Sequence, residues 1–410
     1  MLKEVYTKHK YLHMNDLSNR LMSLSESETL VMSQKSAELK AQGVDVINLS
    51  VGEPDFATPN HIKEAAKKAI DDNFSFYSPV TGFLDLRKAI SEKLKTENNL
   101  TYAPDQIVCS NGAKQSICNV ILAMVNEGDE VIIPAPYWVS YPEMVKLAEG
   151  TPVVINAGID QDFKITAAQL EEAITPKTKA IILCSPSNPT GSVYSKSELK
   201  SLADVLTKHP HVYVISDEIY EHINYIGKHE SIAQFEDLKD RMIIVNGVSK
   251  CYAMTGWRIG WMAAPKAIAS ACSKLQGQYT SGPCSISQKA SLAAYTGSQE
   301  DVEKMRQAFE RRKKLTFKLL SEIDGLETNN PEGAFYLFPK CSSYFGKSHK
   351  EHTIADSADM AIYLLQEGHV ACVAGNAFGA PDHIRLSYAT SEENLVEAVK
   401  RIKEALGKLN

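Results

Sequence analysis

Several features that mark specialised classes of protein are missing from this sequence of 410 residues. No apolar run approaches the ~20 residues that a helix needs to span a bilayer, so we expect no membrane anchor. The N-terminal sequence MLKEVYTKHKYLHMND is polar and lacks the apolar core of a secretory signal. Internal repeats and low-complexity linkers are absent as well. Together these absences predict a globular protein of the cytoplasm.

Positive charge and paired cysteines are also scarce. The 44 lysines and arginines are outnumbered by 50 acidic residues, and the net charge of −6 argues against nucleic acid as a partner. The basic run RRKK at 311–314 lies in a helical stretch, where we expect a solvated face. The eight cysteines form no CxxC pair and no cluster with histidine, so we expect free thiols in a reducing compartment and no metal site.

The hydrophobic content of 44% can build a large core, and the length favours two domains over one. Apolar strands are predicted near 130–135, 152–156, 179–184, 211–216 and 241–247, with helical stretches between them. This alternation predicts an α/β fold with a mostly parallel central sheet covered by helices on both faces. After residue 300, a long charged helix, shorter strands and a final helix capped by Thr390 and Glu393 predict a separate, smaller α/β domain.

The segment SKCYAMTGWRIG places Lys250 directly after the apolar strand RMIIVNGV. An amine held there suits condensation with a carbonyl group, which makes Lys250 the candidate Schiff-base lysine. Taken alone, it could equally be a solvated lysine at the end of a strand. Three further segments favour the functional interpretation.

Polar side chains follow two other predicted strands. Asp217 and Tyr220 come after the strand HVYVIS, and Asn188 lies in the turn SPSNPTG that follows KAIILC. Pyridoxal 5′-phosphate (PLP) accepts electrons only while its pyridine nitrogen stays protonated, and a carboxylate such as Asp217 can hold that proton. Tyr220 and Asn188 can share the ring oxygen. A helix cap, a packed aromatic and ordinary turn chemistry are the competing interpretations of these three residues.

The third segment joins the strand QIVCS to an apolar-periodic helix that is expected to begin near Ala113. Free N–H groups and the positive end of the helix dipole favour an anion at such a junction, and the phosphate of the cofactor fits there. Arg258 and Ser249 can supply further donors to it. Glycine turns before helices are common, and most of them bind nothing.

These segments occur in one order along the chain, together with GEPDF at 52–56, PYWVSYPE at 136–143, GAFY at 333–336 and HIRLSYATSEENL at 383–395. In this order they closely resemble the fold-type I PLP-dependent aminotransferases of the aspartate aminotransferase family. The resemblance extends from about Leu21 to the C-terminal helix. It implies a large PLP-binding domain over residues 51–299 and a small discontinuous domain, with an N-terminal arm, from residues 1–50 and 300–410.

The resemblance assigns roles to individual residues. It makes Lys250, Asp217 and Tyr220 the catalytic residues, with Asn188 beside Tyr220 at the ring hydroxyl. The remaining cofactor contacts that it implies are Trp138 against the ring and Gly112, Ala113, Ser249 and Arg258 around the phosphate. Tyr77 would reach the phosphate of the neighbouring subunit, which implies a homodimer with shared active sites. Trp138 could otherwise be a core aromatic, and Tyr77 one member of an aromatic cluster.

For the substrate, the resemblance places Arg385 on the α-carboxylate, with Gly52 beside it and with Trp138 and Asn188 also in contact. An arginine that alternates with apolar residues in IRLSY could instead face solvent from an edge strand. In one subgroup of the family the lysine of GAKQ, here Lys114, approaches the distal carboxylate of aspartate or prephenate. A solvated lysine in the first helical turn is the alternative, and the form NGAKQ departs from the more usual double glycine.

We therefore expect a PLP-dependent aminotransferase that moves the amino group of L-aspartate to 2-oxoglutarate by a ping-pong mechanism, with Lys250 as both anchor and base. The stretch SLSESETL at 23–30 resembles the mobile segment that closes over substrate in that subgroup. Alternatives are an aminotransferase for aromatic or neutral amino acids or for prephenate, and a PLP-dependent lyase. A PLP-binding regulator would need a DNA-binding domain, for which this chain has no room.

Overall fold

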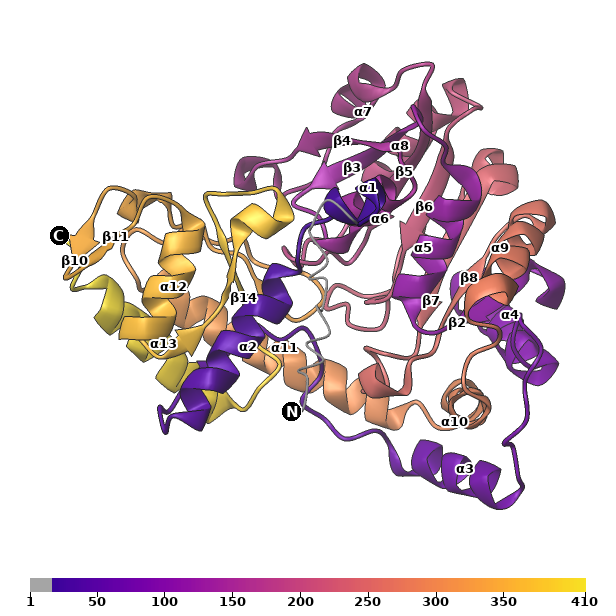
Figure 1. Cartoon of the computed structure of the whole chain (residues 1–410), viewed down its shortest axis with the longest axis horizontal. Coiled ribbons are helices and arrows are strands. Elements are labelled where there is room, and N and C mark those ends of the chain that lie inside the picture. Colours follow the sequence, from indigo (N-terminus) through magenta and orange to yellow (C-terminus); the bar gives the residue numbers. More distant parts are fainter. Residues whose placement is uncertain (1–16) are drawn as a thin grey trace, which may run out of the picture.

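The computed structural model describes residues 17–410, and a seven-stranded sheet forms its centre (Figure 1). In spatial order the strands are β2 (Ile107–Ser110), β8 (Gly260–Ala263), β7 (Met242–Gly247), β6 (Tyr213–Asp217), β5 (Thr178–Cys184), β3 (Glu130–Ala135) and β4 (Thr151–Asn156). Only β8 runs antiparallel to its neighbours, β2 and β7. The predicted mostly parallel sheet is confirmed, and β8 is the strand that the sequence patterns missed.

Helices cover both faces of this sheet because successive side chains of a strand point to opposite sides. Ile132 and Ile181 pack with helices of one face, and their neighbours Val131 and Ile182 pack with helices of the other. The first face is covered by α4 (Leu84–Asn98), α7 (Ala167–Ala173) and α8 (Lys196–Lys208), and the second by α5 (Ala113–Met124), α6 (Ser140–Leu147) and α9 (Lys266–Tyr279). Helix α10 (Ser285–Thr296) packs against α3 (Asn60–Asp71) and α4.

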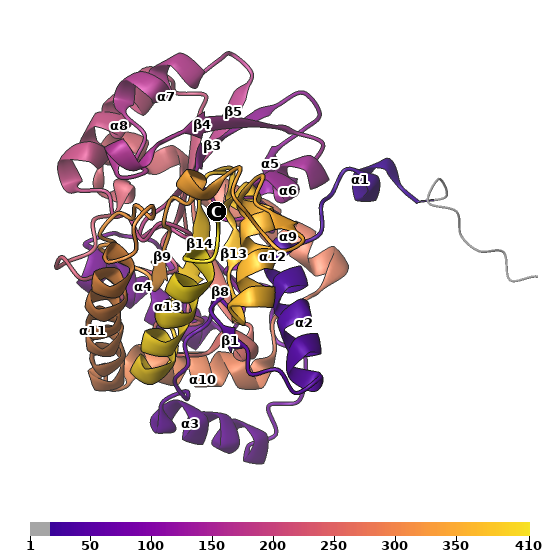
Figure 2. The same ribbon diagram turned by 90° about the vertical axis from the view of Figure 1, so that its left-hand side faces the viewer.

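A second group of elements forms its own core beside the large sheet, on the left of Figure 1. Its helices are α2 (Glu28–Ala41), α11 (Glu300–Ser321), α12 (Ser357–Glu367) and α13 (Glu392–Leu406). Its strands are β9 (Tyr336–Leu337), β13 (Val373–Ala374) and β14 (Ile384–Ser387) in one sheet, β1 (Ile47–Asn48) with β12 (Val370–Ala371), and β10 (Ser348–His349) with β11 (His352–Thr353). Figure 2 shows α13 and α12 over this small sheet, and α2 beside α12.

The N-terminal chain connects the two groups. Helix α1 (Asn19–Met22) packs against α6 of the large sheet, whereas α2 packs against β12 and β13. The polar sequence of residues 1–16, on which the prediction of no secretory signal rests, lies outside the described residues. Among residues 17–410, no helix combines the length and the apolar character that a membrane span needs.

One local prediction was wrong, and a second holds only in part. The final helix is capped by Ser391, whose hydroxyl accepts from the Asn394 N–H at 3.2 Å, so the cap lies one residue beyond the predicted Thr390. The basic run at 311–314 is not uniformly solvated, because α11 packs one of its faces against the rest of the chain. Lys313 is buried there, and Arg312 forms an ion pair with Asp55.

Candidate active site

A cavity of about 270 Å³ opens at the carboxyl ends of the parallel strands β5, β6 and β7. In open α/β sheets this edge is the usual place for a ligand. The small sheet closes the cavity from the other side with Tyr336 of β9 and Arg385 of β14, and the start of α2 contributes Thr29 and Leu30. The cavity therefore lies between the two groups of elements.

Most of the site residues predicted from the sequence lie at this cavity. Eleven of them line it: Gly52, Ala113, Lys114, Trp138, Asn188, Asp217, Tyr220, Ser249, Lys250, Arg258 and Arg385. Gly112 lies just behind this lining, against Arg258. Tyr77 is the exception, since its side chain is 98% exposed and does not line the cavity of its own chain.

The Lys250 amine is held at a defined place in this cavity. Its Nζ donates to the Gly52 carbonyl oxygen at 2.6 Å and lies 5.8 Å from the centre of the Tyr220 ring. Burial, followed by the positive charge of Arg385, lowers the pKa of Lys250 to about 8. A neutral amine is the nucleophilic form, so this environment prepares Lys250 to attack a carbonyl carbon.

Asp217 is a buried carboxylate at the end of β6. Burial raises its pKa to about 6, although its Oδ2 accepts from the Tyr141 hydroxyl at 2.6 Å and its Oδ1 from the Ile219 N–H at 3.2 Å. A carboxylate in such a place gains most from a cationic partner. A protonated ring nitrogen would be that partner.

Arg385 is a buried guanidinium whose hydrogen bonding is incomplete. Nη1 donates to Asn188 Oδ1 at 2.9 Å and Nη2 to the Ser50 carbonyl oxygen at 2.6 Å, whereas Nε has no hydrogen-bond partner within residues 17–410. The group lies 4.5 Å from the centre of the Tyr336 ring. A buried cation of this kind needs an anion, and a carboxylate offers two acceptors.

Helix α5 begins beside Arg258 at the other end of the cavity. Gly112 is its N-cap residue with φ +86°, and a Cβ there would lie 2.4 Å from Arg258 Nη2, so only glycine allows this close approach. The Arg258 guanidinium is fixed by bonds to the Asn111 and Thr255 carbonyl oxygens at 3.1 and 2.9 Å. A helix N-terminus next to a guanidinium favours a phosphate group.

Two tyrosines of the site escaped the sequence-based reasoning. Tyr141 belongs to the PYWVSYPE segment, but nothing in that segment shows that its hydroxyl donates to Asp217. Tyr336 belongs to the GAFY segment, but nothing in that segment shows that its hydroxyl bonds the Tyr220 hydroxyl at 2.8 Å. Both contacts join residues far apart in the chain, which periodicity cannot reveal.

Comparison with known proteins decides the family. Residues 44–402 match the family model described as aminotransferase class I and II. The chain belongs to this aminotransferase family. A probable aspartate/prephenate aminotransferase of Rickettsia bellii is 51% identical over 399 residues, which cover 97% of this chain and 100% of the relative. A bifunctional aspartate aminotransferase and glutamate/aspartate-prephenate aminotransferase of Petunia hybrida is 49% identical over 95% of this chain and 82% of the relative.

Solved structures of aminotransferases share the fold. The aspartate aminotransferase of Rhizobium meliloti superimposes with a TM-score of 0.93 at 44% identity, covering 96% of this chain and 99% of that one. That of Thermus thermophilus with maleate gives a TM-score of 0.89 at 41% identity over 95% and 99% of the two chains. The fold-type I architecture expected from the sequence is thereby confirmed.

Aminotransferases of this family use pyridoxal 5′-phosphate, which is the cofactor of this chain. The cavity fits each of its polar groups. Lys250 with its lowered pKa suits the aldehyde, and the buried Asp217 carboxylate suits a protonated ring nitrogen. The start of α5 beside Arg258 suits the phosphate.

Proposed function

We propose that this aminotransferase moves the amino group of L-aspartate to 2-oxoglutarate, forming oxaloacetate and L-glutamate. The observation that carries the proposal is a lysine of the cavity lining that none of the cofactor contacts uses. Lys114 Nζ lies 4.9 Å from the centre of the Trp138 ring, and partial burial and the nearby Arg258 lower the pKa of this amine. With Arg385 on the α-carboxylate, Lys114 is the group that binds the distal carboxylate of a dicarboxylic amino acid.

The cofactor contacts follow from the same geometry. We assign Asp217 to the ring nitrogen, Tyr220 and Asn188 to the ring oxygen, and Trp138 to the face of the ring. The phosphate contacts are Gly112, Ala113, Ser249 and Arg258. Gly52 holds the Lys250 amine through its carbonyl oxygen and lies beside Arg385.

When bound, PLP supplies an aldehyde that bonds an amine and a ring that takes up the electron pair released at the substrate α-carbon. Lys250 Nζ is the amine that holds the cofactor. Once the amino group of the substrate had replaced it, Nζ would be the base that removes the α-proton and delivers it to the carbon that had been the aldehyde carbon of PLP. Arg385 and Lys114 hold the two carboxylates, so that the Cα–H bond faces this amine.

Prephenate is a second candidate substrate. The relatives from Rickettsia bellii and Petunia hybrida carry prephenate in their names beside aspartate. Prephenate also has two carboxylates, which Arg385 and Lys114 can bind. The apolar side chain of Leu30, which lines the cavity and is 70% exposed, offers a surface for its ring.

The absorbance of the purified, PLP-bound protein tests this proposal. L-aspartate should remove the absorption band of the bound cofactor, and 2-oxoglutarate should restore it. L-alanine, L-tyrosine and L-glutamate serve as comparison donors, and prephenate as an alternative acceptor. A response to another donor alone would contradict the aspartate assignment. Release of ammonia or a thiol, with no pyridoxamine form of the cofactor left behind, would indicate a lyase.

We also propose a homodimer in which Tyr77 of one subunit reaches the phosphate in the other. Tyr77 and its neighbour Phe76 are 98% and 81% exposed, and such large aromatic side chains are rarely left in water without a partner. A second copy of this chain would cover them.

We also propose that the chain forms two domains and that the protein is located in the cytoplasm. A large domain over 51–299 would hold the whole seven-stranded sheet, and a small domain from 1–50 and 300–410 would hold β9, β13 and β14. A cytoplasmic location agrees with eight free cysteines, a form that reducing compartments maintain.

A further inference from the structure

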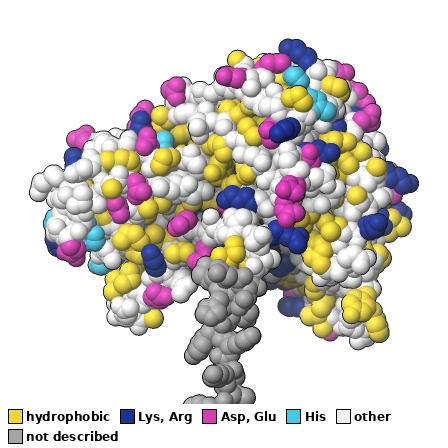
Figure 3. All heavy atoms as spheres, turned by 45° about the horizontal axis from the view of Figure 1, so that its top comes forward, with side chains coloured by type: hydrophobic (Ala, Val, Ile, Leu, Met, Phe, Trp, Pro, Cys, Tyr) yellow, Lys and Arg dark blue, Asp and Glu magenta, His cyan; other side chains and the backbone are white. Residues whose placement is uncertain are grey.

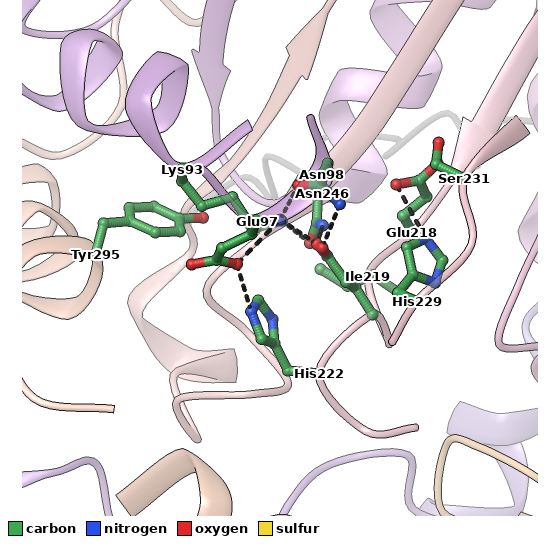
Figure 4. A network of polar contacts seen from close by, with 12 residues as sticks. Lys93, Glu97, Asn98, Glu218, Ile219, His222, His229, Ser231, Asn246 and Tyr295 are labelled. Atoms are coloured by element: carbon green, nitrogen blue, oxygen red, sulfur yellow. Dashed lines mark hydrogen bonds and ion pairs between the residues drawn. The ribbon is translucent and has the colours of Figure 1, made fainter. Parts of the chain in front are cut away.

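The segment from Asp217 to His222 has side chains on two sides. Asp217 and Tyr220 line the cavity, whereas Glu221 and His222 line a separate hollow between α4 and the start of α11. Glu218 also lies away from the cavity, where it forms an ion pair with His229 at 3.2 Å. Figure 4 shows this polar network, with Lys93, Glu97 and Asn98 on one side and Glu218 with His229 on the other. The aminotransferase chemistry described above leaves it without a role.

Glu221 is the centre of this network. Its carboxylate accepts hydrogen bonds from Lys93 Nζ, from Asn98 Nδ2 at 2.6 Å and from Asn246 Nδ2 at 2.7 Å. The side chains of Lys93 and Glu221 are only 4% and 5% exposed. Burial opposes the ionisation of Glu221, but Lys93 and the nearby His222 outweigh it and lower the pKa of this carboxyl group. The carboxylate is therefore ionised and fully bonded.

A metal ion is a competing explanation for the same residues. One ligand atom each from Glu97, Glu221 and His222 could surround an ion, since these atoms lie within 4.8 Å of one another. However, Lys93 Nζ already bonds Glu221 and lies 3.6 Å from Glu97. Burial opposes a positive charge on His222, but Glu221 outweighs it and raises the pKa of this imidazole to about 10. Lys93 and protonated His222 therefore supply the two positive charges that the two carboxylates require, and a protonated imidazole cannot bind a metal ion.

The residues that donate hydrogen bonds to Glu221 lie in regular secondary structure, whereas Glu221 itself lies in a turn. The ladder between β6 and β7 ends at the pair Asp217 and Val245, so Tyr220 and Glu221 lie in a turn beyond it. Asn246, by contrast, lies within β7 and is paired with Trp261 of β8. Lys93 is an interior residue of α4. The carboxylate thus ties an unpaired turn to a paired strand and a packed helix.

We propose that Glu221 is a positioning residue that fixes the turn so that the Tyr220 hydroxyl meets the ring oxygen of PLP. Tyr220 and Glu221 are consecutive, so bonds that fix one carboxylate restrict the backbone of both. The hydroxyl of Tyr220, at the far end of its side chain, is hydrogen-bonded to the Tyr336 hydroxyl at 2.8 Å. This inference rests on the role proposed for Tyr220.

The test is the affinity of the protein for PLP, measured with wild type and with the variants Glu221→Gln, Tyr220→Phe and the two combined. Tyr220→Phe should weaken binding about tenfold, the effect of one lost hydrogen bond. Glu221→Gln should weaken binding to a similar extent. In the combined variant the second change should add little, because both remove the same contact. The wavelength of the absorption band of the bound cofactor should shift in the same direction in all three variants.

Two further variants separate positioning from stability and charge. Glu221→Gln leaves Lys93 buried without a counter-charge, so Lys93→Met/Glu221→Gln supplies a neutral pair that should still bind PLP weakly. Arg241→Met is the matched control. Arg241 is also buried and donates hydrogen bonds to the carbonyl oxygens of His209, Val212 and Leu206, but it lies at the opposite end of β7 from the cavity. The Arg241→Met variant should unfold at a lower urea concentration than wild type and should bind PLP with wild-type affinity.

Three outcomes would overturn the inference: wild-type affinity in Glu221→Gln or in the neutral pair, an Arg241→Met loss as large as that of Glu221→Gln, or fully additive losses with Tyr220→Phe. Failure of wild type to bind PLP would instead overturn the proposed function. A normal wild type with a weakened Tyr220→Phe and an unaffected Glu221→Gln would leave that function intact and remove only the role of Glu221.

Discussion

Lys114 lines the cavity, and we propose that it selects the substrate by binding the distal carboxylate. We expect Lys114→Met to lower kcat/KM for L-aspartate by about 10- to 100-fold, which corresponds to the loss of one charge-assisted hydrogen bond. L-alanine has no distal carboxylate, so its half-reaction is the internal control and should change little. Single-turnover kinetics with both donors checks this, and an equal loss for both would contradict the role.

The Tyr141 hydroxyl donates a hydrogen bond to Asp217 at 2.6 Å, which favours the ionised carboxylate. Burial raises the pKa of Asp217 to about 6, and the Tyr141 hydroxyl opposes that rise. Removing the hydroxyl should therefore raise the pKa further, so that Asp217 loses its charge at a higher pH than in wild type. We expect Tyr141→Phe to move the acid limb of PLP binding by the cofactor-free protein upward by about one pH unit, equivalent to one hydrogen bond.

The control for this prediction is Tyr363→Phe. Tyr363 is also buried, and its hydroxyl donates to the Ala405 carbonyl oxygen at 2.7 Å, outside the cavity lining. Its pH profile should match that of wild type. An acid limb that does not move in Tyr141→Phe would show that Tyr141 has no influence on the ionisation of Asp217.

The sequence identifies the polar residues at strand ends that belong to the site, but it does not identify their hydrogen-bond partners. Asp217 and Lys250 were found because the carboxyl ends of parallel strands meet at one edge, whatever the details of packing. Tyr141 bonds Asp217 from a helix on one face of the sheet, and Tyr336 bonds Tyr220 from the small sheet. Such contacts depend on how separate elements pack, which no local pattern encodes.

Helix α11 shows the same limit at the scale of an element. Its basic run was expected to be solvated, yet the side chain of Arg312 is 11% exposed while that of Arg311 is 64% exposed. Arg312 donates two hydrogen bonds to Asp55 at 2.7 and 3.0 Å and lies 4.9 Å from the centre of the Phe56 ring. Helical geometry puts consecutive residues on different faces, so composition alone cannot tell them apart.

The two neighbours therefore form a matched pair for mutation. Arg312→Ala should lower the free energy of unfolding by about 1 to 3 kcal/mol, because it removes a two-point ion pair and its packing on Phe56. Arg311→Ala should stay within about 0.5 kcal/mol of wild type, since exposed ion pairs contribute little. Urea unfolding of the PLP-free protein measures both, and equal losses would contradict the distinction.

At the scale of the whole molecule, the active site is assembled from nearly the full length of the chain. The cavity takes residues from the start of α2, from the carboxyl edge of the large sheet and from β9 and β14 of the small sheet. Because the cavity lies between two packed groups of elements, its size and shape change whenever these groups move relative to each other. Substrate that bonds Arg385 on one side and Lys114 on the other would favour their approach.

Tyr77 extends this dependence beyond a single chain. If it completes the phosphate site of the partner, Lys250→Ala and Tyr77→Ala homodimers should both be impaired. A hybrid dimer of the two variants has one site that combines an intact Lys250 with the intact Tyr77 of the other subunit, and a second site that lacks both. Mixing the variants under conditions that exchange subunits should therefore restore activity, up to half the wild-type value per hybrid dimer. Wild-type activity of Tyr77→Ala, or a mixture no more active than its parts after exchange is verified by mass, would show that each subunit completes its site alone.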